Sequence, residues 1–312
     1  MKGFRAKENL LVDLSQTEKD FILSTFPEGA VIEESYYFDN YNLPCPIKVK
    51  VKTKDKGSKF VVLRKVRHKN SYGIKLEATV LTLLAQYSIP VPKVLAEPKN
   101  GMMLLSFLEG ENLQLFSMNS KAHAKKAKKL LLEALTTLEN ITEKISKDAG
   151  DELPSYTLMD ELNAITEKPP WNSEKIFKEV VDFLTPVLRQ ISTSLIFTNG
   201  DYQPANFLTD GEKIVGFLDF ENAKLRDPLM GIAKYPVYDL HPLNKAGFVD
   251  TYLTGRNFTE QQFFSRLSLF CLITLQKEIS VHPTDKEEKV YQKRVLDLLE
   301  RSLTGITNSP IN

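Results

Sequence analysis

Residues 199–206 read NGDYQPAN and residues 207–221 read FLTDGEKIVGFLDFE, and this stretch is the most informative in the chain. Residues 206–209 predict a short strand, Asp210-Gly211 a tight turn, and residues 213–218 a returning strand, so that together they form a hairpin. The hairpin brings Asn206 and Asp219 to the same end. It therefore predicts that two side chains with oxygen ligands converge shortly after Asp201 in the sequence.

These side chains suit the binding of a divalent cation. Carboxylate and amide oxygens are the hard ligands that magnesium prefers, and Glu221 offers a second carboxylate. In kinases an Asp accepts the proton of the attacking hydroxyl, an Asn five positions later holds magnesium, and a later Asp holds magnesium that bridges the ATP phosphates. Asp201, Asn206 and Asp219 have this order and spacing. The alternative is a polar loop that only joins two strands, but the hairpin and the apolar strand ending at Asp219 favour the catalytic interpretation.

The same stretch resembles the catalytic segment of the aminoglycoside phosphotransferase and choline kinase superfamily. That segment reads His-Gly-Asp, then Asn, then an apolar strand that ends in Asp-x-Glu, and the match here is Asn199-Gly200-Asp201, Asn206 and Asp219-Phe220-Glu221. The resemblance implies that Asp201 is catalytic and that Asn206 and Asp219 bind the metal. It also implies acceptor-binding or supporting roles for their neighbours Asn199, Tyr202, Gln203 and Glu221.

Segments upstream resemble the nucleotide-binding half of the same superfamily. Residues 59–65, KFVVLRK, resemble the strand that ends in a phosphate-contacting cation. This cation is implied to be Arg64, with Lys65 as the alternative, because strand side chains alternate between faces. Glu77 is then the implied ion-pair partner of the cation. Residues 103–111, MLLSFLEGE, are similar to the interlobe hinge, which implies adenine contacts at Ser106, Phe107 and Leu108.

The resemblance and the predicted elements together indicate an α+β, two-lobed protein-kinase-like fold. We expect a small nucleotide-binding N-lobe of antiparallel sheet and helix at residues 1–105, a hinge at 106–112, and a larger, mainly helical C-lobe with the catalytic loop and acceptor site at 113–312. Within the N-lobe, valines and lysines alternate at 47–52 and predict a strand, while a capping box at Ser15 and Glu18 predicts a helix that extends to about residue 26. In the C-lobe, apolar residues from Leu131 to Ile145 recur at three and four residue steps and predict one long helix.

Composition limits the classes of partner and compartment. The chain has 312 residues, 42% of them hydrophobic, and its 41 basic and 40 acidic side chains give a net charge of +1, which argues against a nucleic-acid partner. Cys45 and Cys271 have no metal-ligand spacing, and so few thiols suit a reducing compartment, so we expect a cytoplasmic protein. The charged N-terminus lacks a signal-peptide core and the most apolar stretch, 267–275, is too short to cross a bilayer, so we expect no membrane partner.

Three features depart from the superfamily pattern. Asn199 stands where the family has His, and Gly231 stands where the family often has a second Asp after Asp-Pro. Residues 36–44, which precede the cationic strand, contain no glycine for a phosphate-binding loop. These departures suggest an alternative to catalysis, namely a pseudokinase or nucleotide-binding interaction protein without efficient turnover.

The predicted activity is an ATP- and magnesium-dependent phosphotransferase that moves the γ-phosphoryl group of ATP to a hydroxyl of a small-molecule acceptor. A protein kinase is disfavoured because no Ala-Pro-Glu segment follows Asp219. The identity of the acceptor and the oligomeric state stay open. A cationic acceptor would need an acidic pocket, for which the candidate carboxylates are Glu221, Asp239, Asp250 and Glu260.

Overall fold

The structure is a computed structural model that describes residues 10–38, 46–54, 57–66, 72–192, 194–240 and 242–307. Cys45 and most of the glycine-free stretch, residues 39–44, lie outside the described residues. The chain divides into two compact units. Unit 1 comprises Met1–Phe116, Lys144–Leu153 and Pro204–Ala223, and unit 2 comprises Ser117–Glu143, Pro154–Gln203 and Lys224–Asn312. The hairpin stretch from residue 204 onwards therefore folds with the N-terminal sheet, whereas Asp201 belongs to unit 2.

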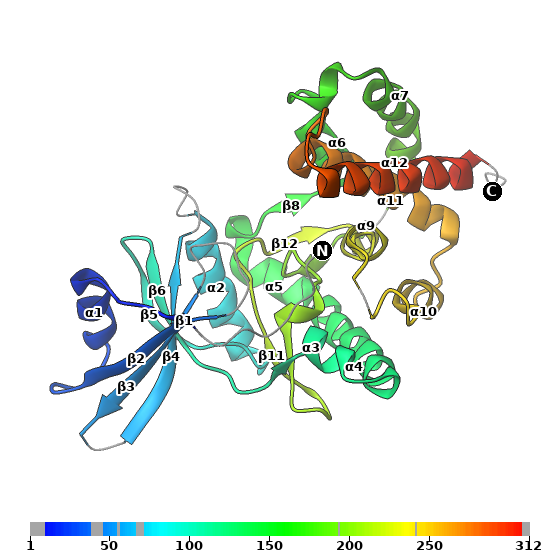
Figure 1. Ribbon diagram of the computed structural model, residues 1–312. Helices are drawn as coiled ribbons and strands as arrows, with labels where there is room; N and C mark the ends of the chain where they lie inside the picture. The colour runs from blue at the N-terminus through cyan, green and yellow to red at the C-terminus, as the bar shows by residue number, and fades with distance from the viewer. Residues whose placement is uncertain are drawn as a thin grey trace. The chain divides into compact units, whose positions relative to one another are not determined.

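Unit 1 is built on a six-stranded antiparallel sheet, drawn in blue and cyan, with strand order β1-β2-β3-β4-β6-β5 (Figure 1). Its strands are β1 Leu10–Leu11, β2 Val31–Tyr37, β3 Ile47–Thr53, β4 Gly57–Lys65, β5 Val94–Lys99 and β6 Met102–Ser106. In β3 the side chains of Ile47, Val49 and Val51 are buried, and the lysines between them are partly or fully exposed, as the alternation predicts.

Two helices of unit 1 complete its core. Helix α1 (Gln16–Leu23) begins at Ser15, whose hydroxyl accepts the backbone N–H of Glu18 while the Glu18 carboxylate accepts that of Ser15. This is the predicted capping box. Ile22 of α1 is fully buried in one cluster with residues of β3 and β4. Helix α2 (Tyr72–Gln86) packs beside β5 and β6.

The predicted hairpin forms a second, smaller sheet in unit 1. Strand β10 (Phe207–Thr209) pairs antiparallel with β11 (Ile214–Phe217) and, on its other side, with β7 (Glu111–Asn112). The 3-10 turn η3 (Pro204–Asn206) leads into β10. The short strand β7 thus pairs the last two residues of the predicted hinge with the hairpin.

Unit 2 is mainly helical, and its helices α11 (Glu260–Glu278) and α12 (Lys286–Thr307) pack against each other. The hydroxyls of Ser268 and Ser302 are hydrogen bonded across this pair at 2.7 Å. A three-stranded sheet, β8-β12-β9, has one parallel and one antiparallel pairing. In unit 1, η1 spans Gly150–Glu152, and α3 Leu113–Met118 and α5 Thr142–Ala149 cross from one unit to the other along the chain. The other elements of unit 2 are α4 Lys121–Asn140, β8 Ser155–Tyr156, α6 Leu158–Thr166, η2 Trp171–Ser173, α7 Lys175–Arg189, β9 Ile196–Thr198, β12 Lys224–Arg226, α8 Pro228–Ile232, α9 Lys234–Tyr238 and α10 Phe248–Gly255.

One helix prediction was wrong. The apolar stripe from Leu131 to Ile145 is divided between α4 and α5, because Ile141 leaves the helical region with φ −95° and ψ 2°. Side-chain spacing is nearly preserved across this break, so the apolar pattern could not reveal it. None of the helices in the described ranges is both long enough and apolar enough to traverse a bilayer.

Candidate active site

The site begins with a cluster of one cation and three carboxylates in unit 1. Arg64, near the end of β4, lies 3.0 Å through Nε from Oε2 of Glu77 on α2. Its Nη2 atom lies 2.8 Å from Oδ1 of Asp219 and 3.0 Å from Oε2 of Glu221, the two carboxylates that follow β11. The sheet, the helix and the hairpin therefore each supply a charged side chain to one point. We call these four residues the Arg64 cluster.

Because Arg64 and Glu77 are buried, the charges of the Arg64 cluster strongly affect the pKa values of these two residues. Arg64 and Glu77 are only 5% and 3% exposed. Burial alone would lower the pKa of Arg64, but Glu77, Asp219 and Glu221 together raise it above its ordinary value. Burial raises the pKa of Glu77, and Arg64 opposes that rise by its charge and its hydrogen bond. The guanidinium thus offsets part of the free-energy cost of burying the Glu77 carboxylate.

Lys65, the alternative cation, points away to a different partner. Its ammonium lies 2.8 Å from Oε1 of Glu18, the capping residue of α1. This separation follows from the strand, in which neighbouring side chains take opposite faces. Of the two candidates, Arg64 is the one that the structure brings to Asp219.

Asn206 and Asp219 lie at the same end of the hairpin. Phe207 pairs with Phe217, and the backbone N–H of Leu218 donates to the carbonyl of Asn206 at 2.9 Å, so Asp219 follows directly after the residue opposite Asn206. Asp219 takes a φ of +63°, which is uncommon for a residue with a side chain and is found at functional sites. The backbone N–H of Phe220 donates to Oε1 of Glu77 at 3.3 Å and ties this turn to α2.

The loop with the predicted catalytic Asp belongs to unit 2 and is held by its own side chains. Asn199 is buried, and its Oδ1 atom accepts the backbone N–H of Asp201 at 3.1 Å. The hydroxyl of Thr198 accepts the N–H of Gly200 at 2.6 Å, at a φ of +84° that suits glycine. Asn199 therefore shapes the loop through a backbone bond that needs no imidazole.

Two side chains of α9 that the sequence analysis did not identify contact this loop. The Lys234 ammonium lies 2.6 Å from Oδ1 of Asp201, which also accepts the backbone N–H of Gln203 at 3.0 Å. The Tyr235 hydroxyl donates to the carbonyl of Tyr202 at 2.8 Å. Burial raises the pKa of Tyr235, so its hydroxyl keeps the proton that it donates. Only the position of these residues soon after Asp227-Pro228 could have drawn attention to them.

The Tyr202 ring takes the space that a side chain at position 231 would occupy. Tyr202 is buried in unit 2, and an ideal Cβ at Gly231 would lie 2.5 Å from Cδ2 of the ring. Gly231, where the sequence analysis noted the absence of a second Asp, is thus matched to an aromatic residue of the predicted catalytic loop. This burial favours a packing role for Tyr202.

This packing gives a first testable expectation, for Gly231→Ala. The added methyl overlaps the Tyr202 ring, so we expect a loss of about 1–3 kcal/mol in the free energy of unfolding. The matched control is Gly255→Ala in α10, where no atom lies within 4 Å of the new Cβ and stability should stay the same or rise by about 0.5–1 kcal/mol. Urea unfolding of both variants measures the difference. Equal stability of the two would contradict the packing of Tyr202 against Gly231.

The predicted hinge residues carry an aromatic cluster in unit 1. The ring of Phe107 lies 6.4 Å from that of Phe38 and 5.8 Å from that of Phe60, measured between centroids. The Lys48 ammonium lies 4.1 Å and 4.2 Å from the Phe60 and Phe107 ring centroids. The aromatic rings thus present apolar faces next to the positive charge of Lys48.

The other two hinge residues contact backbone or apolar neighbours. Ser106 exchanges hydrogen bonds with Lys93, since its N–H donates to the Lys93 carbonyl and its hydroxyl accepts the Lys93 N–H, each at 2.8 Å. Leu108 packs closely over Gly216 of β11, where an ideal Cβ would lie 3.0 Å from its Cδ1 atom. The segment thus offers apolar surface next to the hairpin.

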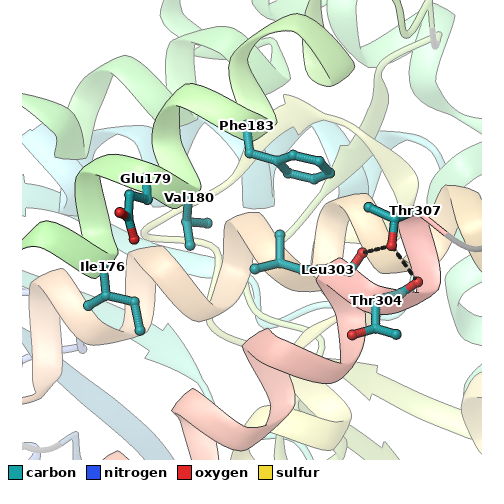
Figure 2. Close-up of a pocket in the computed structure, with 7 residues that line it drawn as sticks. All are labelled: Ile176, Glu179, Val180, Phe183, Leu303, Thr304 and Thr307. Carbon is teal, nitrogen blue, oxygen red and sulfur yellow. Dashed lines mark hydrogen bonds between the residues drawn. The ribbon is translucent and has the colours of Figure 1, made fainter.

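Two other features of unit 2 are structural. Trp171 is buried and its indole N–H donates to the carbonyl of Ile279 at 2.7 Å, so it packs in the core. A groove of about 410 Å³ lies between α7 and α12. Figure 2 shows its lining side chains, with Thr307 donating to the carbonyls of Leu303 and Thr304. Its lining residues are Ile176, Glu179, Val180, Phe183, Leu303, Thr304 and Thr307. None of these belongs to the predicted site.

The donor chemistry of the hairpin end fits a hard divalent cation. Asn206 and Asp219 offer amide and carboxylate oxygens, and Glu221 lies two residues after Asp219. One guanidinium faces three carboxylates in the Arg64 cluster, so acidic groups outnumber basic ones among its four members. Among the described residues, no group of three or more His, Cys, Asp or Glu side chains is placed to hold a metal ion unaided. These residues therefore suit a divalent cation that takes its remaining ligands from oxygen atoms outside this set of side chains.

Comparisons with known proteins identify the family and the fold. A model of the phosphotransferase enzyme family matches residues 48–262. A search of curated protein sequences finds no match. The GDP and kanamycin complex of APH(2")-IIia is 16% identical, with a TM-score of 0.61, 95% of this chain covered and 100% of that one.

Two further solved structures show the same fold. A ternary complex of a thermostable mutant of aminoglycoside phosphotransferase APH(4)-Ia with AMP-PNP and hygromycin B is 14% identical, with a TM-score of 0.66, covering 93% of this chain and 100% of that one. LicA in complex with AMP is 14% identical, with a TM-score of 0.62, covering 91% of this chain and 97% of that one. These likenesses confirm the predicted α+β, kinase-like fold class.

Proposed function

Because this chain belongs to the phosphotransferase enzyme family, we propose that it transfers the γ-phosphoryl group of ATP to a hydroxyl of a small molecule. The observation that carries the proposal is the Arg64 cluster, in which a strand cation, a helix carboxylate and the carboxylates after the hairpin meet. The relatives of known structure were solved with AMP-PNP, AMP or GDP, which supports a nucleotide as the phosphoryl donor.

Asp201 is the proposed base for the acceptor hydroxyl. One of its carboxylate oxygens is anchored by Lys234 and by the Gln203 backbone, so the orientation of the carboxylate is set before a substrate arrives. Asn199 and Tyr235 hold the backbone on either side of it. The carboxylate accepts the hydroxyl proton as the oxygen attacks the phosphorus, which is the general-base role in phosphoryl transfer.

Asn206 and Asp219 are the proposed ligands of magnesium, and Arg64 is the proposed contact to phosphate. When bound, the ion would neutralise charge on the phosphates. The guanidinium of Arg64 presents further N–H donors beside Asp219 and adds positive charge where the phosphoryl group develops negative charge. Glu77 keeps the guanidinium in place. Ser106, Phe107 and Leu108 are proposed to contact adenine through the apolar surface described above.

Incubation of the purified protein with ATP, magnesium and hydroxyl compounds tests the proposal. Phosphorylated acceptor is detected by mass spectrometry and phosphorus NMR, and a chelator should abolish its formation. Nucleotide binding is followed separately by thermal shift, since a ligand at ~100 times its dissociation constant adds about 2.7 kcal/mol to stability. Binding without any transfer or ATP turnover would instead favour the interaction-protein alternative. The bonds that Asn199 makes to the loop do not favour that alternative.

A further inference from the structure

A lysine of the chain itself, Lys234, lies beside the proposed base Asp201, which an acceptor hydroxyl must reach in the proposed reaction. Lys234 is the first residue of α9, and its ammonium lies 2.6 Å from Oδ1 of Asp201. The same ammonium lies 5.1 Å from the centroid of the Tyr238 ring. Only 13% of the Lys234 side chain is exposed. The cation is therefore held between a carboxylate and an aromatic face rather than extended into solvent.

Carboxylates and aromatic faces are the groups that recognise a cationic ligand. At the proposed base, Lys234 already interacts with both kinds of group, namely the Asp201 carboxylate and the Tyr238 ring. The other sheltered carboxylates of unit 2 are likewise paired within the unit, and the pairs are Asp227 with Arg266, Glu139 with Arg256, and Glu161 with Arg226. An acceptor amine would have to displace an internal cation to use any of them.

The candidate carboxylates that the sequence analysis named for a cationic acceptor do not change the pairing of Asp201 with Lys234. Asp239, Asp250 and Glu260 are all exposed in unit 2. Glu221 is bound to Arg64 in unit 1. Within unit 2, the carboxylate of the proposed base is paired with the Lys234 ammonium.

We infer that Lys234 makes this site select acceptors that carry no positive charge near the reacting hydroxyl, so that the acceptor is neutral or anionic. The inference rests on the proposed phosphotransferase function and on Asp201 as its base. An acceptor cation beside Asp201 finds that carboxylate already paired and lies close to the Lys234 ammonium. The repulsion between two like charges about 6 Å apart at an effective dielectric constant of about 20 disfavours binding by roughly 100-fold, and the attraction of Asp201 offsets only part of this. A neutral hydroxyl compound avoids this repulsion, and an anionic one gains an ammonium partner. Lys234 is thus a specificity-determining residue.

Acceptors that share one skeleton but differ in charge test the inference. Glucosamine, glucose and gluconate form one such series, and choline with its uncharged carbon isostere forms another. The wild-type protein is expected to show a kcat/KM at least ~10-fold higher for the neutral and anionic members than for the cationic ones. Lys234→Met should shrink that ratio at least several-fold, whereas Lys234→Arg should keep it.

The matched control is Lys293→Met in α12, where Lys293 lies 2.7 Å from Asp297 and is mostly exposed. That variant removes a lysine–aspartate pair of the same unit and should leave the charge preference unchanged. A wild-type preference for cationic acceptors, or a preference that Lys234→Met does not alter, would overturn the inference while leaving the phosphotransferase proposal intact. Absence of transfer to every acceptor together with absence of ATP turnover would overturn both.

Discussion

Asp201→Asn should lower the rate of phosphoryl transfer by about 1000-fold while nucleotide binding stays near the wild-type level. The amide has nearly the same shape and can still accept the Gln203 backbone N–H, but it cannot take the proton of the acceptor hydroxyl. The groups proposed to bind nucleotide lie in unit 1 and are not altered by the change. Single-turnover transfer and thermal shift with nucleotide measure the two properties separately.

Loss of the ion pair with Lys234 has its own, smaller consequence. Asp201→Asn leaves a sheltered ammonium without its carboxylate, so we expect the free energy of unfolding to fall by about 1 kcal/mol. Asp239→Asn is the matched control, because Asp239 is exposed and its φ of +48° is one that Asn tolerates. That variant should keep both its rate and its stability. Full activity in Asp201→Asn would rule out the proposed base.

Arg64→Met is expected to cost at least about 3 kcal/mol of stability and to weaken nucleotide binding. The change leaves Glu77 buried without its cation and leaves Asp219 and Glu221 close to it as further negative charges. The neighbouring variant Lys65→Met is the control, because its pair with Glu18 is partly exposed and should contribute less than about 1 kcal/mol. Urea unfolding of the two variants gives the comparison.

A second variant and a pH series show whether Arg64→Met loses stability through an unpaired charge or through lost packing. Adding Glu77→Gln to Arg64→Met removes the uncompensated carboxylate and should restore part of the lost stability. Burial raises the pKa of Glu77 and Arg64 opposes the rise, so loss of Arg64 moves the folded-state pKa further above the unfolded value. A group of this kind binds more protons in the folded state, so the deficit should shrink as the pH falls from about 8 to about 5. If Arg64→Met behaves like Lys65→Met, the Arg64 cluster is not a stabilising unit.

Local sequence patterns predicted the parts of the site that lie close together along the chain. The hairpin after Asn206 follows from apolar strands around Asp210-Gly211, and its pairing alone brings Asn206 and Asp219 to one end. The capping box at Ser15 and the alternation in β3 were likewise confirmed, because each depends on neighbours a few residues apart. The roles of the site residues in catalysis and binding stay predictions.

What required the tertiary structure is the set of contacts between residues far apart in the chain. Arg64 meets Asp219 across 155 positions, and Lys234 meets Asp201 across 33. The break at Ile141 and the fit of Tyr202 against Gly231 were equally invisible in the sequence. Periodicity and turn chemistry act over a few residues, so the sequence was enough to predict most of the elements and to name the candidate ligands. Which charges neutralise one another depends on how whole elements pack, and only the folded chain decided that Arg64 is shared by three carboxylates and that Asp201 is paired with a lysine.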